Sequence, residues 1–221
     1  MEIMKNMQHY LVLFLLFGVA NAQNNALDAE ADALLKTVSA KYQKYATAKI
    51  DLKLVIDLPE VDENQVMEVQ AWIKGDKFKI EMKDQMFISD NVTIWNYLKE
   101  YNEVQINDYE AEDAMFSPSI LFNLYTKDYV YRLKEEYKTS TGKVIKVIEL
   151  TPIKKDQNFF KIELKIDFVN TSIIEAKIYE KSGMRYTYTI KSLTPNITLD
   201  ADFFKFKPEL YKGIQISDSR F

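Results

Sequence analysis

The amino-acid sequence predicts an α+β fold, an incomplete (half-) barrel of roughly ten to eleven antiparallel strands with an N-terminal helix and a short helical lid over the concave face. Hydrophobic residues recur at helical spacing over residues 26–48, and the period then changes to two for most of the chain. Glycine-containing turns separate the alternating segments, which is typical of hairpins. An open sheet with so many strands tends to curl, because every strand twists in the same sense.

The first 22 residues have the layout of a secretory signal peptide. Met1 and Lys5 precede an apolar run over residues 11–19, and Ala20-Asn21-Ala22 then forms a small-residue cleavage site. The run is shorter than the roughly 20 apolar residues that a membrane-spanning helix needs. We therefore expect cleavage before Gln23 and export to the periplasm, with residues 23–221 forming a single domain. An uncleaved anchor is the alternative.

The composition excludes several classes of function. The sequence has no cysteine, and its one histidine, His9, lies in the expected signal peptide. This excludes Ser/His/Asp and Cys/His nucleophilic sites and the common zinc sites, and leaves carboxylates, Lys, Tyr and Ser for any chemistry. Because the acids mostly lie at alternate strand positions that face water, we expect no metal, no cofactor and no enzymatic activity. The formal charge of −4 argues against nucleic acid as a partner. Without a cysteine the chain cannot carry the acyl anchor of a bacterial lipoprotein, so we expect a soluble protein that is not tethered to a membrane. We also expect it to be a monomer.

Residues 26–48 are predicted to form an amphipathic helix. Asp28, Glu30 and Asp32 lie near its start, where acidic residues favour the helix dipole. The apolar stripe, which we expect to pack on the core, consists of Leu27, Ala31, Leu34, Leu35, Val38, Tyr42 and Tyr45.

The strands are predicted from hydrophobic residues that alternate with polar ones. Their apolar positions run from Ile50 to Leu58, Met67 to Ile73, Phe78 to Met82, Tyr129 to Leu133, Ile148 to Leu150, Phe160 to Phe168, Ile174 to Ile178, Tyr186 to Ile190 and Phe204 to Phe206. Such strands have one apolar and one solvated face, and their short turns predict an antiparallel meander.

The alternation stops over residues 109–125. Ser117 followed by Pro118 is a typical start of a helix, with the serine as N-cap and the proline at the first helical position. We expect a short helical insert here that covers the concave apolar face as a lid.

The predicted sheet has more apolar surface than its helices can cover. Either the barrel is filled by its own side chains, or the concave face holds an apolar ligand. Flexible methionines favour the ligand. The residues expected to contact it are Leu52, Leu54, Ile56, Met67, Val69, Ile73, Phe78, Ile80 and Met82 on strands, with Met115, Phe116, Leu121 and Leu124 on the lid.

Three segments resemble a known family, in order and spacing. Ala71–Ile80 is similar to its hairpin with a basic turn, and Ile88–Tyr97 to its Ser-Asp-Gly-x-x-x-Trp-x-Tyr signature, which a strand at Glu103–Gln105 follows. Phe204–Pro208, with Gly213 and Asp218 behind it, is similar to its closing segment. On these grounds the chain resembles the outer-membrane lipoprotein carrier family (LolA-like) over essentially the whole of residues 23–221.

The resemblance implies a periplasmic carrier that holds lipoprotein acyl chains and has no enzymatic activity of its own. Members take lipoproteins from an ABC-type exporter in the inner membrane and deliver them to an outer-membrane acceptor. The sequence departs from the family in two places, because Asn91 replaces the signature glycine and the turn Lys74-Gly75-Asp76 lacks the arginine that helps to close the lid. The alternatives are an envelope sensor or assembly factor on the same half-barrel, a carboxylate-based periplasmic hydrolase, and a barrel filled by its own side chains.

Overall fold

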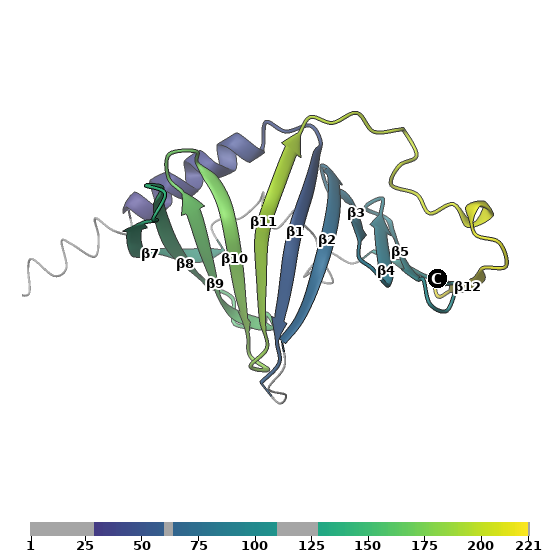
Figure 1. The fold of residues 1–221 in the computed structure, drawn as a ribbon. Coiled ribbons are helices and arrows are strands. Elements are labelled where there is room, and N and C mark those ends of the chain that lie inside the picture. Colours follow the sequence, from purple (N-terminus) through teal and green to yellow (C-terminus); the bar gives the residue numbers. More distant parts are fainter. Residues whose placement is uncertain (1–28, 60–63, 110–127, 221) are drawn as a thin grey trace, which may run out of the picture.

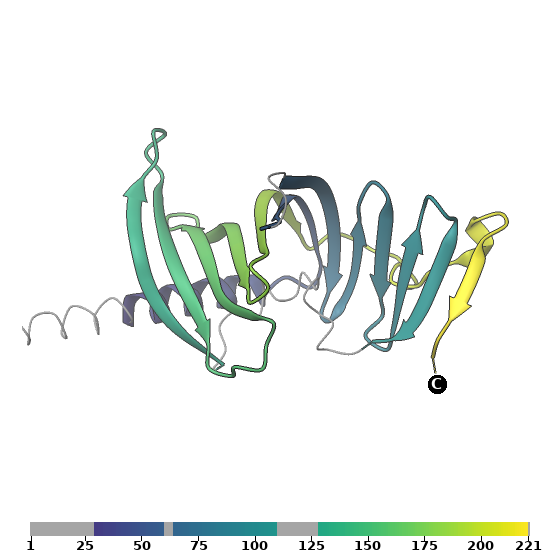
Figure 2. The ribbon, with the colours of Figure 1, turned by 90° about the horizontal axis from the view of Figure 1, so that it is seen from below.

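A computed structural model describes residues 29–59, 64–109 and 128–220 of the chain. They form one helix (residues 29–42) and one twisted, open sheet (Figure 1). Figure 2 shows the same sheet from below, with the helix beside β7–β10. The expected signal peptide and the four expected lid residues, Met115, Phe116, Leu121 and Leu124, lie outside the described residues.

The sheet consists of two antiparallel meanders. The first contains β1 (Ala48–Asp57), β2 (Asn64–Lys74), β3 (Lys77–Glu81), β4 (Gln85–Ser89), β5 (Thr93–Leu98) and β6 (Glu103–Asp108). The second contains β7 (Tyr129–Lys138), β8 (Val144–Pro152), β9 (Phe159–Asp167), β10 (Ser172–Glu180) and β11 (Arg185–Pro195). A 3-10 turn, η3 (Pro208–Leu210), and a short strand, β12 (Gln215–Asp218), follow.

The first and last long strands join the two meanders. β1 pairs with β11 along its whole length, so that the strand order is β12-β6-β5-β4-β3-β2-β1-β11-β10-β9-β8-β7. The described part of the sheet is open, with β7 at one end of this order and β12 at the other. The predicted half-barrel is therefore confirmed, with 12 strands instead of ten to eleven. The prediction of an all-antiparallel sheet is wrong at one end, because β12 runs parallel to β6.

The β4–β5 turn shows how asparagine replaces glycine in this chain. Asn91 adopts a positive φ of 75°, and its backbone N–H donates to Ser89 Oγ at 3.2 Å. The Asp90 carboxylate accepts from the backbone N–H groups of Val92, at 3.0 Å, and Thr93, at 2.9 Å. Asparagine tolerates left-handed backbone better than most residues, so this substitution preserves the turn.

Two β-bulges overturn part of the predicted alternation. Phe160 and Ile174 were expected on the apolar face, but each is skipped in the β9–β10 register. As a result Phe159 and Ile173 are buried instead, while Phe160 is 49% exposed. An extra residue shifts every later side chain to the opposite face, which explains both errors.

The expected strand at Phe204–Phe206 is also wrong. This segment has turns and bends in place of a strand, yet Phe204 and Phe206 are both buried. Their spacing of two residues is that of a strand, but here it arises because an irregular segment contacts the sheet through both side chains.

Hydrophobic clusters lie on both faces of the sheet. The inner cluster joins the helix to β1–β3 and β7–β11, and we call the face that carries it the inner face. The outer cluster lies on the opposite, outer face of β4–β6, where Met86, Tyr97 and Val104 pack against Phe204 and Phe206 of the C-terminal segment. In the part of the chain that the structure describes, no helix is long and apolar enough to cross a membrane.

Candidate functional site

The inner face is continuous across the junction of the two meanders. Leu54 of β1 lies opposite Tyr188 of β11 on one side and Met67 of β2 on the other. The pairing of Ile73 with Phe78 extends the same face to β3. Directly paired residues of antiparallel strands point to the same side of a sheet. These alternating positions therefore build one apolar surface from β11 to β3.

All nine residues that were expected to contact a ligand from strands belong to the inner cluster or pack against it, although Met82 comes just after the end of β3. Six of them are buried: Leu52, Leu54, Val69, Ile73, Phe78 and Ile80. The other three, Ile56, Met67 and Met82, are partly exposed at the edge of the cluster. That these residues share one face is thus a structural fact, whereas their contact with a ligand stays a prediction.

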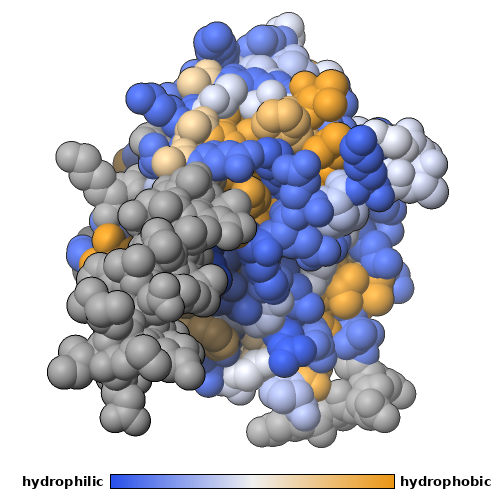
Figure 3. Space-filling view, turned by 90° about the vertical axis from the view of Figure 1, so that its left-hand side faces the viewer, coloured by the Kyte–Doolittle hydropathy of each residue, from blue (hydrophilic) through white to orange (hydrophobic). Residues whose placement is uncertain are grey.

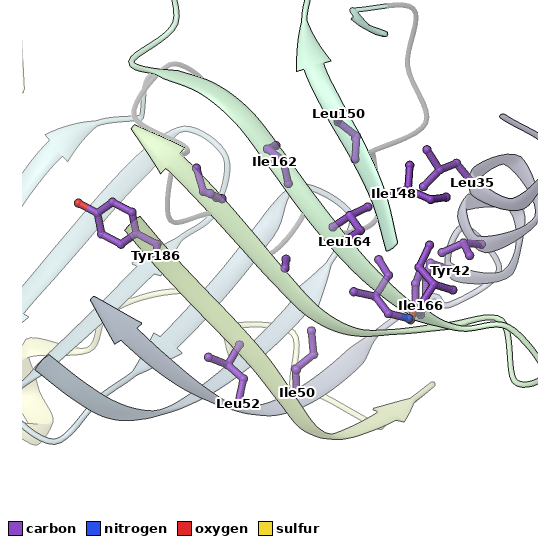
Figure 4. Close-up of a cluster of buried hydrophobic side chains, with 14 of the residues drawn as sticks. Leu35, Tyr42, Ile50, Leu52, Ile148, Leu150, Ile162, Leu164, Ile166 and Tyr186 are labelled. Atoms are coloured by element: carbon purple, nitrogen blue, oxygen red, sulfur yellow. The ribbon is translucent and has the colours of Figure 1, made fainter. Parts of the chain in front are cut away.

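The described helix covers only part of the inner cluster. Leu35 and Tyr42 lie beside Ile148 and Ile166, whereas Tyr186 lies well away from the helix (Figure 4). Burying apolar area against β8 and β9 stabilises this end of the sheet by roughly 25 cal/mol per Å². Over β11 and β1–β3 the apolar surface continues beyond the helix.

Polar contacts fix both ends of the helix to the sheet. Near the start, Lys146 of β8 pairs with Glu30 of the helix and, at 3.1 Å, with Glu136 of β7. At the other end Tyr42 Oη accepts a hydrogen bond from the buried backbone N–H of Ile173 at 2.9 Å, and Lys41 Nζ donates to the backbone oxygen of Asn170 at 2.7 Å. The helix is therefore an anchored part of the core.

The tyrosines of the inner face report a nonpolar environment. Burial raises the pKa of Tyr188 well above its usual range, and burial also raises the pKa values of Tyr186 and Tyr129. Loss of water disfavours the charged phenolate, so these side chains stay neutral. The tyrosine positions of the inner face thus present neutral phenol groups beside the hydrocarbon of the inner cluster.

The outer face of β7–β11 has the opposite character. The Glu163 carboxylate accepts hydrogen bonds from Lys134 at 2.6 Å, Lys161 at 3.0 Å and Tyr179 at 2.9 Å. Burial alone would raise the pKa of Glu163, but the hydrogen bonds from Lys134, Lys161 and Tyr179 outweigh it and lower this pKa to about 2. Seen from the β7 side, hydrophilic residues cover most of the described surface (Figure 3). The alternating lysines and acids therefore form a solvated face, as the sequence predicts.

Residues that could hold a metal ion do not gather in the described parts of the chain. Over residues 29–59, 64–109 and 128–220, no group of three or more histidine, cysteine, aspartate or glutamate side chains has a suitable arrangement.

Sequence reasoning missed a polar row on the inner face. Asn96 of β5 and Gln105 of β6 pair with each other and continue the face on which Phe87 of β4 lies. The available signal was that Asn96 interrupts the apolar run between Trp95 and Tyr97. The outer cluster was also missed. Its signal was that β4 and β5 have apolar residues at both odd and even positions, which is typical of strands buried on two faces.

The chain is similar to several solved structures at low sequence identity. An uncharacterized conserved protein from Thermus thermophilus is 14% identical, with a TM-score of 0.55 over 86% of this chain and 99% of that chain. A LolA superfamily protein from Nitrosomonas europaea is 13% identical, with a TM-score of 0.43 over 80% and 97% of the two chains. The lipoprotein LppX from Mycobacterium tuberculosis is 10% identical, with a TM-score of 0.45 over 78% and 100%. At 14% identity, the similarity to the Thermus thermophilus protein concerns the fold alone.

A family model supplies the assignment that the structural similarities alone do not. No curated protein matches the sequence. The model described as "Outer membrane lipoprotein carrier protein LolA" matches residues 70–207, from β2 to the segment just before η3. This range is more than half of the chain and includes the β2–β3 turn and the Ser89–Tyr97 signature. The chain therefore belongs to the outer membrane lipoprotein carrier protein LolA family.

Proposed function

We propose that this protein is a periplasmic carrier that binds the acyl chains of lipoproteins against its inner face and moves them from the inner to the outer membrane. In this proposal an ABC-type exporter loads the carrier and an outer-membrane acceptor unloads it. The chain itself performs no chemistry.

One observation carries the proposal. The inner cluster runs from β7 through β11 to β3, while the described helix packs against only one part of it. An acyl chain is a suitable occupant because it needs apolar contact and no specific hydrogen bonds along its length. Partly exposed Met67 and Met82 favour a ligand of irregular shape, since methionine adapts its conformation readily.

The energetics favour a passive carrier. Transfer from water gains about 0.8 kcal/mol per methylene, hence about 12 kcal/mol for one chain of about sixteen carbons. Two or more chains together would exceed the ceiling of ~18–21 kcal/mol for noncovalent binding, so a carrier cannot realise the whole gain, and an acyl chain does not return to water on its own. A membrane interior is as apolar as the inner face. Loading therefore needs an external energy source, and release needs an acceptor that binds the lipid slightly better.

A pair of neighbouring substitutions tests the inner face. Met67 packs at the edge of the inner cluster, while Val66 is 57% exposed on the opposite face of the same strand. Glutamate at position 67 would place an unpaired charge against the acyl chain. We expect Met67→Glu to weaken the binding of a triacylated lipopeptide at least about tenfold, and Val66→Glu to leave it unchanged.

The measurement is the affinity for the lipopeptide in detergent-free buffer, with native mass spectrometry of protein from the periplasm to detect co-purified lipid. Circular dichroism confirms that both variants are folded. A folded Met67→Glu variant with wild-type affinity, or wild-type protein that binds no lipid in either experiment, would refute the proposal.

A further inference from the structure

We infer that the Asn96 side chain on β5 accepts a hydrogen bond from an N–H group at the junction between the acyl chain and the polar part of a bound lipid. This inference rests on the proposed function, since it assumes that acyl chains lie on the inner face.

The register of three strands places Asn96 beside the apolar surface. Asn96 lies opposite Phe87 of β4, which in turn lies opposite Ile80 of β3. Phe87 packs against the inner cluster, and so does Ile94, two residues before Asn96 in the same strand. Asn96 therefore stands on the inner face where its apolar part ends and a polar part begins.

Neighbouring side chains fix the orientation of the Asn96 carboxamide. The Glu103 carboxylate only accepts hydrogen bonds when ionised, so Gln105 turns its Nε2 toward Glu103 Oε1, at 3.4 Å. Gln105 Oε1 then faces β5 and accepts from Asn96 Nδ2 at 3.3 Å. This leaves Asn96 Oδ1 directed away from Gln105.

Asn96 Oδ1 is a buried acceptor without a partner among the described residues. It is one of two buried side-chain oxygen or nitrogen atoms there that make no hydrogen bond. Such an acceptor destabilises a fold when it stays unpaired, because the group loses its bonds to water. A carboxamide at this position is therefore better explained by a ligand that supplies a donor than by the stability of the sheet.

The missing donor identifies the chemical class of the ligand. An acyl chain attached to the amino group of a polypeptide is joined through an amide, whose N–H is the first donor after the hydrocarbon. An ester linkage at the same place has no donor. The geometry thus favours amide-linked over ester-linked acyl chains, with the hydrocarbon along β3–β1 and the amide at Asn96.

Two probes of equal length test this preference. N-methylpalmitamide and methyl palmitate differ only in that the first has an N–H where the second has an oxygen. We expect the wild-type protein to bind the amide about fivefold more tightly than the ester, and Asn96→Leu to lose this preference while keeping its affinity for the ester. Asn107→Leu is the matched control, because Asn107 lies on the same face opposite Ile94 but is exposed; it should keep the preference.

The outcomes separate this inference from the proposed function. If the wild-type protein binds neither probe, the role of Asn96 and the proposed function are both refuted. If it binds the two probes equally, or if Asn96→Leu retains the preference, only the role of Asn96 is refuted. Should Asn96→Leu fail to fold, NMR of the wild-type protein with ¹³C-labelled asparagine decides. The Asn96 side-chain carbonyl signal should then shift with the amide and not with the ester, and equal shifts with both probes would overturn the inference.

Discussion

Removing one oxygen atom from Tyr42 tests how the N-terminal helix is fixed to the sheet. Ile173 begins the β-bulge of β10, where the backbone leaves the regular ladder. Its buried N–H donates to Tyr42 Oη at 2.9 Å. The variant Tyr42→Phe keeps the aromatic ring in the inner cluster but leaves this N–H without its acceptor.

The expected cost follows from the burial of the donor. A buried N–H that loses its partner destabilises the protein by about 1–3 kcal/mol. The ring contacts are kept in this variant, so they add nothing to this cost. For a chain of this size, each kcal/mol lowers the melting temperature by about 2–4 °C. We therefore expect Tyr42→Phe to melt several degrees below the wild-type protein, and the Ile173 amide to exchange with deuterium faster.

Tyr45→Phe is the matched control for this experiment. Tyr45 lies three residues further along, is only partly buried and contacts Tyr42 edge-on, with ring centroids 5.7 Å apart. The same loss of one oxygen at this position should leave the melting temperature nearly unchanged. Equal stability of Tyr42→Phe and wild type, together with a protected Ile173 amide, would show that the hydrogen bond does not anchor the helix.

Two further predictions concern the outer face and a turn. The pKa of Glu163 is lowered to about 2, so the stability that its ionised form contributes is complete above its unfolded pKa, near 4.5, and is lost as the pH falls through about 2. Glu163→Gln should thus destabilise the protein at pH 7 by about 1–2 kcal/mol after allowance for solvent screening, and the difference should vanish near pH 2 in urea titrations. Glu135→Gln, at an exposed position, is the control. A destabilisation by Glu163→Gln that does not depend on pH would contradict the stabilising role of the ionised Glu163 carboxylate. At the β4–β5 turn, Asn91→Ala should cost about 1 kcal/mol and Asn91→Gly nothing, because φ is 75°. Equal urea midpoints for Asn91→Ala and wild type would show that the turn relaxes.

The sequence predicts this fold best where alternation is strict. Ile50, Leu52 and Leu54 of β1 all lie in the inner cluster, as do Ile162, Leu164 and Ile166 of β9. In such strands the side-chain period alone decides which residues are buried. The candidate site on β1–β3 could be predicted for the same reason, because every one of its residues follows this alternation.

The remaining features depend on contacts between distant parts of the chain. A bulge such as the one at Phe160 is defined only relative to its partner strand, so one strand's sequence does not reveal it. The pairing of β1 with β11 joins segments that lie about 140 residues apart in the sequence, without a short connection between them. Asn96 was missed for a different reason, because a single polar residue in an apolar run acquires meaning only once its neighbours Phe87 and Gln105 are known.

The two ends of the sheet are stabilised on opposite faces. At the β7–β10 end, the inner face is buried by the helix and the outer face is charged, so this end is stabilised from inside. At the β4–β6 end the arrangement is reversed, because Phe204, Phe206 and Tyr211 cover the outer face. Since the outer cluster stabilises β4–β6, their inner face need not be wholly apolar for the sheet to fold. That freedom allows Asn96 to remain there, and it explains why a polar binding group would lie at this end of the sheet and not beneath the helix.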